Sequence, residues 1–179
     1  MASKRWSGML VCIACLFAVF FVHSAAFGAA SVADKQARRI LQATGVQGGL
    51  VVHLGCGKGR LTAALRPNDS YVVHGLDTDA KDVRAARRYV RDKGFYFYLK
   101  IEHGGGNSLP YATDLVNLVV ADELHGTPMK ELMRVLAPGG IAYVKENGGW
   151  VKRTKPWPRE IDEWSHFLYH TTHNAISKD

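Results

Sequence analysis

The residues whose types and spacing most clearly predict a binding site in this chain are three glycines and one carboxylate. Gly55, Gly57 and Gly59 lie in the segment VVHLGCGKG, which begins with a short apolar run. Glycines at the turn from a strand into a helix allow a ligand to approach the backbone amides closely. Asp77 ends a second apolar run, twenty-two residues after Gly55, and a carboxylate there can accept hydrogen bonds from both hydroxyls of a ribose. Together these residues predict a nucleoside site.

The spacing of the glycines disfavours a dinucleotide ligand. The fingerprint GxGxxG needs glycine or alanine at position 60, where this chain has Arg60, and the observed spacing is GxGxG. NAD is therefore the less favoured ligand. A glycine turn alone is a weak signal, so the prediction depends on the elements around it.

Strand and helix patterns alternate along the chain. Short apolar runs predict strands, and segments with helical spacing or capping residues predict helices. The expected strands are 48–54, 71–76, 95–101, 114–121 and 141–145, and the expected helices are 31–44, 60–66, 79–93 and 128–136. This alternation predicts a parallel sheet that binds ligands outside the carboxyl ends of its strands. The segment ENGG followed by WVKR predicts a closing hairpin.

The motifs and their order resemble those of class I S-adenosylmethionine (SAM) methyltransferases. The resemblance covers about residues 46–144 and rests on VVHLGCGKG, HGLDTD, NSLPYATDLVNLVV and MKELMRVLAPGGIAYV. It implies an α/β, Rossmann-like parallel sheet in the order 3-2-1-4-5 with helices on both faces, to which the hairpin would add one antiparallel strand. It also implies methyl transfer from SAM to an acceptor that the fold does not identify.

The resemblance further implies which residues hold SAM. The methionine part would lie over the glycine turn, the ribose on Asp77, and the adenine near the loop after the third strand. The expected cofactor-binding residues are His53, Gly55, Cys56, Gly57, Gly59, Asp77, Thr78, Asn107, Ser108 and Leu109.

Two positions depart from the family's pattern. His53 stands two residues before Gly55, where the family has an acidic residue that helps to hold the amino end of SAM, and an imidazole does not supply that charge. Gly105 stands where the family offers an aspartate to the adenine amino group, which removes one hydrogen bond at a net loss of about 1 kcal/mol. We expect SAM binding to be weakened and not abolished.

His125, in the segment ADELHG after the fourth strand, is the candidate catalytic base. Methyl transfer needs a base only when the acceptor must lose a proton, and a solvent-exposed loop histidine is the alternative interpretation. Asp122 and Glu123 can equally be capping or solvated groups. None of the eight histidines has the spacing and partners of a metal site, so we expect no metal.

The first thirty residues have the composition of a secretory signal. Lys4 and Arg5 precede an uncharged apolar run at 9–22, which is followed by the small-residue stretch HSAAFGAAS. We therefore expect a signal peptide at 1–30 and export to the periplasm or the medium, with an uncleaved membrane anchor as the alternative. Cleavage would leave Cys56 as the single cysteine, so no intramolecular disulfide is expected.

The positive charge of the chain does not predict nucleic-acid binding. The formal charge of +7 falls to +5 when Lys4 and Arg5 leave with the signal, and much of the rest lies on the expected helix 79–93. That helix lacks the interleaved aromatics of a nucleic-acid surface, so a solvated basic face is the preferred interpretation.

The remainder of the chain divides into a methyltransferase-like domain at 31–150 and an aromatic segment at 151–179. The ending KPWPREIDEWSHFLYHTTHNAISKD resembles the junction in large exported bacterial proteins, notably of planctomycetes, where such a domain precedes a propeller of pyrroloquinoline-quinone-like repeats. The resemblance implies that its aromatic residues anchor a propeller partner, and packing back onto this domain is the alternative. These residues are Trp157, Trp164, Phe167 and Tyr169.

Export conflicts with a SAM-dependent reaction, because SAM is made and used in the cytoplasm. Two hypotheses follow. The first is a SAM-dependent methyltransferase of unknown acceptor, which Asp77 and the glycines favour. The second is a catalytically silent Rossmann-like module that binds a partner, which His53 and Gly105 favour.

Overall fold

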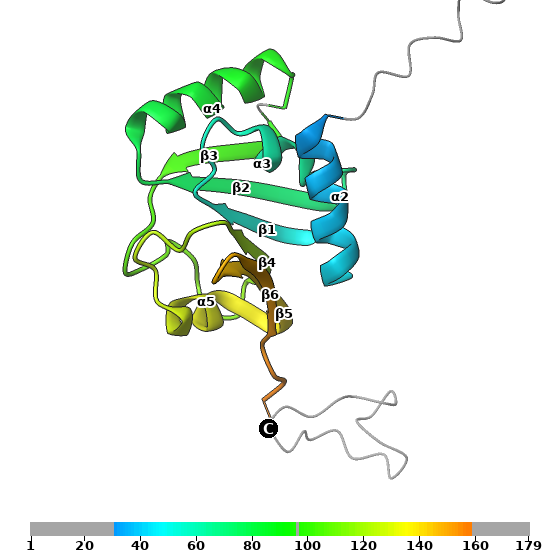
Figure 1. Cartoon of the computed structure of the whole chain (residues 1–179), viewed down its shortest axis with the longest axis vertical. Helices are drawn as coiled ribbons and strands as arrows, with labels where there is room; N and C mark the ends of the chain where they lie inside the picture. Colours follow the sequence, from blue (N-terminus) through cyan, green and yellow to red (C-terminus); the bar gives the residue numbers. More distant parts are fainter. Residues whose placement is uncertain (1–30, 96, 159–179) are drawn as a thin grey trace, which may run out of the picture. The chain divides into compact units, whose positions relative to one another are not determined.

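The strands of the described residues form one six-stranded sheet (Figure 1). The structure is a computed structural model that describes residues 31–95 and 97–158. The strand order is β3-β2-β1-β4-β5-β6, with β1 to β5 parallel and β6 antiparallel to β5. The strands are β1 Gly49–Leu54, β2 Tyr71–Asp77, β3 Leu99–His103, β4 Val116–Ala121, β5 Leu136–Glu146 and β6 Gly149–Thr154. The predicted α/β class, the sheet order and the added antiparallel strand are confirmed.

Helices cover both faces of this sheet, as expected. Three of them pack on one face and the fourth packs on the other. In Figure 1 the green helix α4 lies beside β3, and the yellow helix α5 lies beside β5. The first three are α2 Val32–Thr44, α3 Arg60–Ala64 and α4 Ala80–Asp92, and the fourth is α5 Met129–Val135.

The central strands are nearly continuous apolar runs because both of their faces are buried. Successive side chains of a strand point to opposite faces. Val51 of β1 therefore packs in the core under α2, α3 and α4, and its neighbour Val52 packs in the core under α5. The same alternation along β4 places Leu118 in the first core and Val119 in the second.

Helix α4 begins and ends where its capping residues predict. The side chain of Asp79 accepts a hydrogen bond from the Lys81 amide at 2.7 Å, and Gly94 follows the last turn with a φ of 76°. The basic side chains of the helix are exposed, as expected for a solvated face: Arg84, Arg87, Arg88, Arg91 and Lys93.

Two strands begin four or more residues away from the predicted start. The third strand was expected at 95–101, but β3 begins at Leu99, and Phe97 lies in a turn with 88% of its surface exposed. Aromatic content is a weak guide here because β propensity mainly reflects packing on a half-buried surface. The fifth strand was expected at 141–145, but β5 begins at Leu136 and includes APGG. The register shift between Val116 and Leu118 accommodates this segment.

The structure also describes the two ends of the domain. Strand β6 pairs with β5 as far as Thr154, four residues beyond the expected boundary at 150. In α2, Val32 is 83% exposed, and the buried stripe is formed by Ala37, Ile40 and Thr44. The expected signal at 1–30 lies outside the described residues, as do three of the four tail aromatics, whereas Trp157 is described and exposed. Within 31–158, no helix has the length and apolarity needed to cross a membrane.

Candidate nucleoside site

The carboxylate of Asp77 lies against the glycine turn. Its Oδ2 accepts a hydrogen bond from the Gly57 amide at 2.7 Å, and its Oδ1 accepts one from the Asp79 amide at 2.9 Å. Asp77 is the last residue of β2, which pairs in parallel with β1, so both strands end at the same edge of the sheet. The side chain is 6% exposed. The spatial proximity that the sequence predicted is therefore present.

The backbone amides of the glycine turn bond to the protein itself. The amides of Gly55 and Cys56 both donate to the Leu76 carbonyl, at 2.9 and 3.1 Å, and the Gly59 amide donates to the Cys56 carbonyl at 2.9 Å. With the bond from Gly57 to Asp77, these four amides have partners inside the fold. These amides are therefore satisfied within the protein, and a close approach of a ligand to the turn stays a prediction. The glycines supply the turn and the space above it.

Each of the three glycines has different surroundings. All three have positive φ values, of 69°, 50° and 76°. A β-carbon at Gly55 would lie 2.5 Å from Nε2 of His125, whereas one at Gly57 would meet nothing within 4 Å. At Gly59 it would lie 2.9 Å from Cβ of Ala86 in α4. Gly59 therefore permits close helix packing, Gly57 leaves open space, and Gly55 lies under an imidazole.

A small crevice at the carboxyl ends of β1, β2, β3 and β4 is lined by Gly55 and Asp77. Side chains fill it so closely that it has no room for a water-sized molecule, whereas small-molecule pockets have roughly 300 Å³ or more. A larger groove along β2, β3 and α4 contains neither the glycine turn nor Asp77, so we place the candidate site in the smaller crevice. The crevice is lined by Leu54, Gly55, Leu76, Asp77, Thr78, Gly104, Gly105, Leu124, His125 and Thr127.

His53 points away from the crevice, toward α3. Its Nδ1 lies 2.8 Å from Oγ1 of Thr62, and its Nε2 is buried without a hydrogen-bond partner in the described part of the chain. Burial lowers the pKa of His53 to about 4, although the nearby Asp77 carboxylate acts in the opposite direction. The imidazole is therefore neutral at pH 7 and does not line the crevice.

The thiol of Cys56 also belongs to the core. Cys56 is 4% exposed and packs with the apolar residues under α4. Burial, together with the nearby Asp77 carboxylate, raises the pKa of Cys56 to about 12. Gly75 of β2 leaves room for this packing, since a β-carbon there would lie 3.0 Å from Cβ of Cys56. Cys56 therefore contributes its backbone to the turn, and its thiol is inert.

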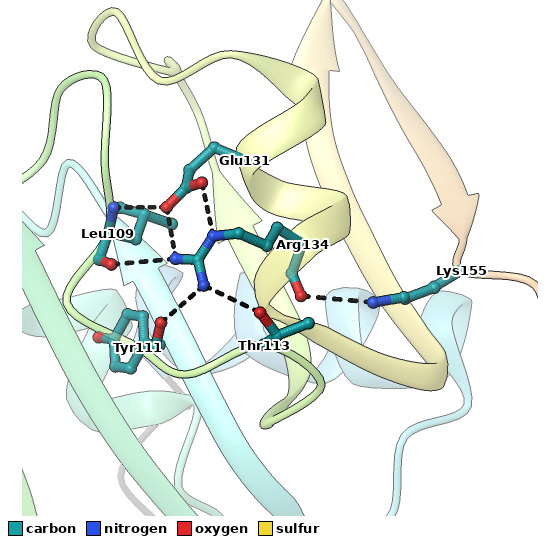
Figure 2. Close-up of polar contacts among 6 residues, drawn as sticks. All are labelled: Leu109, Tyr111, Thr113, Glu131, Arg134 and Lys155. Atoms are coloured by element: carbon teal, nitrogen blue, oxygen red, sulfur yellow. Dashed lines mark hydrogen bonds and ion pairs between the residues drawn. The ribbon is translucent and has the colours of Figure 1, made fainter.

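Among the residues expected near the adenine, Leu109 is held by hydrogen bonds from and to side chains of α5. The Leu109 amide donates to Oε1 of Glu131 at 2.7 Å, and the Leu109 carbonyl accepts from Arg134 at 3.3 Å. Figure 2 shows these two helical side chains meeting the loop. Leu109 is buried in the core under α5, whereas Asn107 and Ser108 are exposed. None of the three lines the crevice, whose wall on this side is formed by Gly104 and Gly105.

Arg134 also bonds to other residues of this loop, so Glu131 and Arg134 together form a clamp that holds the loop to α5. Its Nη1 donates to the Tyr111 carbonyl at 3.0 Å, and its own carbonyl accepts from Lys155 at 3.3 Å (Figure 2). Hydrogen bonds from Arg134 and from the Leu109 amide lower the pKa of Glu131 to about 2. Glu131 is therefore ionised at neutral pH and joins α5 to the segment that leads into β4.

The segment after β4 contains one residue that the sequence did not indicate. Thr127 lines the crevice and is 2% exposed, and its Oγ1 has no hydrogen-bond partner among the described residues. His125 lines the crevice as predicted, whereas Asp122 and Glu123 are exposed and do not. His103 does not line the crevice; its Nε2 lies 3.0 Å from the carbonyl of Thr78, which does line it. A lone threonine in a loop has no periodicity or motif by which the sequence could mark it.

Metal coordination has no basis in the described residues. Within 31–95 and 97–158, no group of three or more His, Cys, Asp or Glu side chains lies close enough to hold an ion. The polar side chains that line the crevice are the carboxylate of Asp77, the hydroxyls of Thr78 and Thr127, and the imidazole of His125.

Comparison with known proteins identifies the family. Residues 51–140 match the family model described as the methyltransferase domain. This match spans half of the chain, so the chain belongs to the methyltransferase domain family. The matched region includes the glycine turn, Asp77 and the crevice.

Two curated relatives are similar to parts of the chain. Demethylmenaquinone methyltransferase of Lactobacillus johnsonii is 28% identical over 154 residues, which cover 73% of this chain and 63% of that protein. Methyltransferase GfsG of Streptomyces halstedii is 31% identical over 96 residues, which cover 50% of this chain and 34% of that protein. The chain thus spans less than two thirds of the length of either relative.

The fold is shared with solved methyltransferase structures. One is geranyl diphosphate C-methyltransferase from Streptomyces coelicolor, solved in complex with Mg²⁺, geranyl diphosphate and S-adenosyl-L-homocysteine. The TM-score is 0.55 at 18% identity, over 62% of this chain and 44% of that chain. At this identity the likeness shows the fold, and not the substrate.

Proposed function

We propose that this chain binds SAM in the crevice beside Asp77 and transfers its methyl group to an acceptor. The observation that supports this most directly is the position of Asp77 against the glycine turn, 2.7 Å from the Gly57 amide. Strand order reverses between β1 and β4, and ligands of open α/β sheets bind outside the strand ends at such a point. SAM is also the cofactor expected of the methyltransferase domain family.

The Asp77 carboxylate retains the capacity to hold a ribose. An ionised carboxylate has about four acceptor positions, and each oxygen of Asp77 uses one of them for a backbone amide. One position on each oxygen remains for the two ribose hydroxyls. The glycine at 57 leaves open space beside that carboxylate.

The reaction supported by this site is an in-line displacement. A lone pair of the acceptor would attack the methyl carbon of SAM while the carbon–sulfur bond breaks and its electron pair returns to sulfur, leaving S-adenosylhomocysteine. The main task of the protein is to place the two reactants. Neither relative identifies the acceptor, because this chain spans only 63% and 34% of their lengths.

Two features of the site favour the second candidate, a catalytically silent module. The crevice has no room for a water-sized molecule, and the buried, neutral imidazole of His53 is hydrogen-bonded to Thr62. A neutral imidazole also cannot replace the carboxylate that would hold the amino end of SAM. We therefore propose that affinity and turnover are low for this family, and that complete absence of binding would indicate the silent module.

Isothermal titration calorimetry of the full chain with SAM and with S-adenosylhomocysteine tests the proposal. The informative variant is Asp77→Asn, and Asp79→Asn is its matched control, because asparagine also caps helices and the charge change is the same. Micromolar binding that is lost in Asp77→Asn and retained in Asp79→Asn supports the methyltransferase. Absence of heat at millimolar ligand with the unmodified chain overturns it. Thermal melting of both variants confirms that each is folded.

A further inference from the structure

The imidazole of His125 lies directly above Gly55. A β-carbon at position 55 would lie 2.5 Å from its Nε2 and 3.0 Å from its Cδ2. The ring therefore occupies the space that the absence of a side chain at Gly55 creates. Because His125 and Gly55 both line the crevice, this ring helps to explain why the crevice has no room for a water-sized molecule.

The backbone around His125 is suited to movement. His125 has a φ of 47° and Gly126 a φ of 84°, so two consecutive residues are left-handed. A left-handed conformation is uncommon for a residue other than glycine, and such strained backbone often occurs in segments that change conformation. His125 is exposed to solvent, so its ring can leave the crevice without disrupting a core.

The hydroxyl of Thr127 belongs to a second residue that lines this crevice. Thr127 is 2% exposed and lines the same crevice, and its Oγ1 has no partner in the described part of the chain. Buried hydroxyls usually form hydrogen bonds, so an unpartnered one calls for an explanation. A polar group of a bound ligand would satisfy it.

We propose that residues 124–127 form a displaceable wall of the crevice, in which His125 occupies the ligand space and Thr127 provides a hydrogen bond to the bound ligand. The ligand is a nucleoside with a polar sulfonium or thioether side chain, so this inference rests on the proposed function. Displacement of His125 enlarges the crevice toward the size of a small-molecule pocket. The apparent affinity is then reduced by the fraction of molecules in which the ring occupies the crevice.

Calorimetry of the full chain with S-adenosylhomocysteine tests both residues. His125→Ala removes the occupying ring and is expected to tighten binding about tenfold, which corresponds to a ring that is in place about 90% of the time. Thr127→Val retains the shape and is expected to weaken binding about three- to tenfold, through loss of one hydrogen bond. Glu123→Ala, an exposed change immediately before this segment, is the control and is expected to have no effect.

A second experiment needs no ligand and tests whether the His125 ring occupies the space beside position 55. Gly55→Ala should destabilise the unmodified chain more than it destabilises the His125→Ala variant, because the contact with Nε2 is absent in the variant. The left-handed strain at position 55 is the same in both backgrounds, so it cancels. Urea unfolding of the four proteins provides this comparison.

The outcomes separate this inference from the proposed function. If His125→Ala leaves binding unchanged or weakens it, the ring does not compete with the ligand and the inference is overturned. Unchanged affinity in Thr127→Val overturns the role of the hydroxyl. If the unfolding comparison shows the contact but no variant binds S-adenosylhomocysteine, the proposed function fails, and the ring is shown to occupy the crevice for another reason.

Discussion

Asp77 and Gly57 are joined by a hydrogen bond of 2.7 Å between a buried carboxylate and the amide of the glycine turn. The same carboxylate holds the amide of Asp79 at the start of α4. One side chain therefore joins the ends of β1 and β2 to the following helix. A ligand that bonded to Asp77 would contact a group that also shapes the fold.

We predict that Asp77→Asn destabilises the protein as well as altering ligand binding. Asparagine replaces one accepting oxygen with an amino group, so one backbone amide loses its partner, at a loss of about 1–3 kcal/mol. Asp79→Asn should change the free energy of unfolding by less than about 0.5 kcal/mol, because it retains the cap. Urea unfolding monitored by circular dichroism measures both. Equal effects would show that the bond to Gly57 contributes little.

Gly57 and Gly59 should respond differently to alanine. Both have positive φ values, but a β-carbon would meet nothing within 4 Å at Gly57 and would lie 2.9 Å from Cβ of Ala86 at Gly59. Both substitutions introduce backbone strain of about 1–2 kcal/mol, and Gly59→Ala adds an overpacking loss of about 1–3 kcal/mol.

A double-mutant cycle provides the control for this contact. Gly59→Ala should be less damaging in an Ala86→Gly background than in the unmodified chain, whereas Gly57→Ala should be equally damaging in both. The free energy of unfolding in urea is the measurement. If Gly57→Ala proves the more harmful of the two substitutions, the assignment of open space at Gly57 is wrong.

Glu131 is predicted to stabilise the protein in a pH-dependent way. Its pKa is lowered to about 2, mainly by hydrogen bonds from Arg134 and from the Leu109 amide. A lowered pKa in the folded state means that the stabilisation is present above the ordinary value of 4.5 and is lost as pH falls toward about 2. Glu131→Gln should therefore be destabilising at pH 7, by about 1 kcal/mol.

The difference between Glu131→Gln and the unmodified chain should shrink as pH falls below 4.5. Lys130→Ala, an exposed change on the same helix, should leave the pH profile unaltered. Unfolding midpoints between pH 3 and pH 7 are the measurement. A difference that stays constant across this range would contradict the role of the ionised clamp.

His53 is predicted to remain neutral in the folded protein at mildly acidic pH. Burial lowers its pKa from 6.5 to about 4, so below pH 6.5 the unfolded chain takes up a proton that the folded chain does not. Stability should therefore fall as pH decreases from 6.5 toward 4. His74, whose pKa is also lowered by burial, acts in the same direction.

His53→Gln should remove part of this pH dependence, and the rest should remain because of His74. Proton NMR of the imidazole Cε1–H signals measures the titration of each histidine directly. A midpoint near 6.5 for the His53 signal would show that the ring is not buried as described.

The N-terminal segment predicts processing on export, with cleavage after Gly28 or Ala30. N-terminal sequencing of the protein from an exporting bacterial host should find a start at position 29 or 31. Leu16→Arg, which interrupts the apolar run, should block this processing. An intact Met1 or Ala2 on cytoplasmic protein made from the unmodified chain would contradict the prediction.

The arrangement of the sheet could be predicted because its signals are local. Apolar runs, glycine turns and capping residues such as Asp79 determine where strands and helices lie, and strand–helix alternation determines a parallel sheet. Once β1 and β2 are parallel neighbours, Gly55 and Asp77 must lie at the same edge. The exceptions were the start of β3 and the start of β5, where aromatic content and a proline-glycine pair are ambiguous signals.

The sequence could not predict in the same way which polar atoms of the site are left without a partner inside the protein. Which acceptor takes each amide of the turn depends on the register between β1 and β2, and a slip of one strand by one residue would exchange the two faces of that strand. The hydrogen bond from the Leu109 amide to Glu131 joins residues twenty-two positions apart. Only the packing of α5 on the sheet brings these two residues together.

By itself, the sequence determined the order of the elements, the fold class and the edge of the sheet at which a carboxylate meets three glycines. The tertiary structure alone decided that the turn's amides are satisfied internally, that His125 lies over Gly55 and that the Thr127 hydroxyl is left without a partner. The physical reason is that periodicity and turn chemistry act within a few residues. Space and hydrogen-bond partners in a crevice depend on the packing of segments that are distant in the chain.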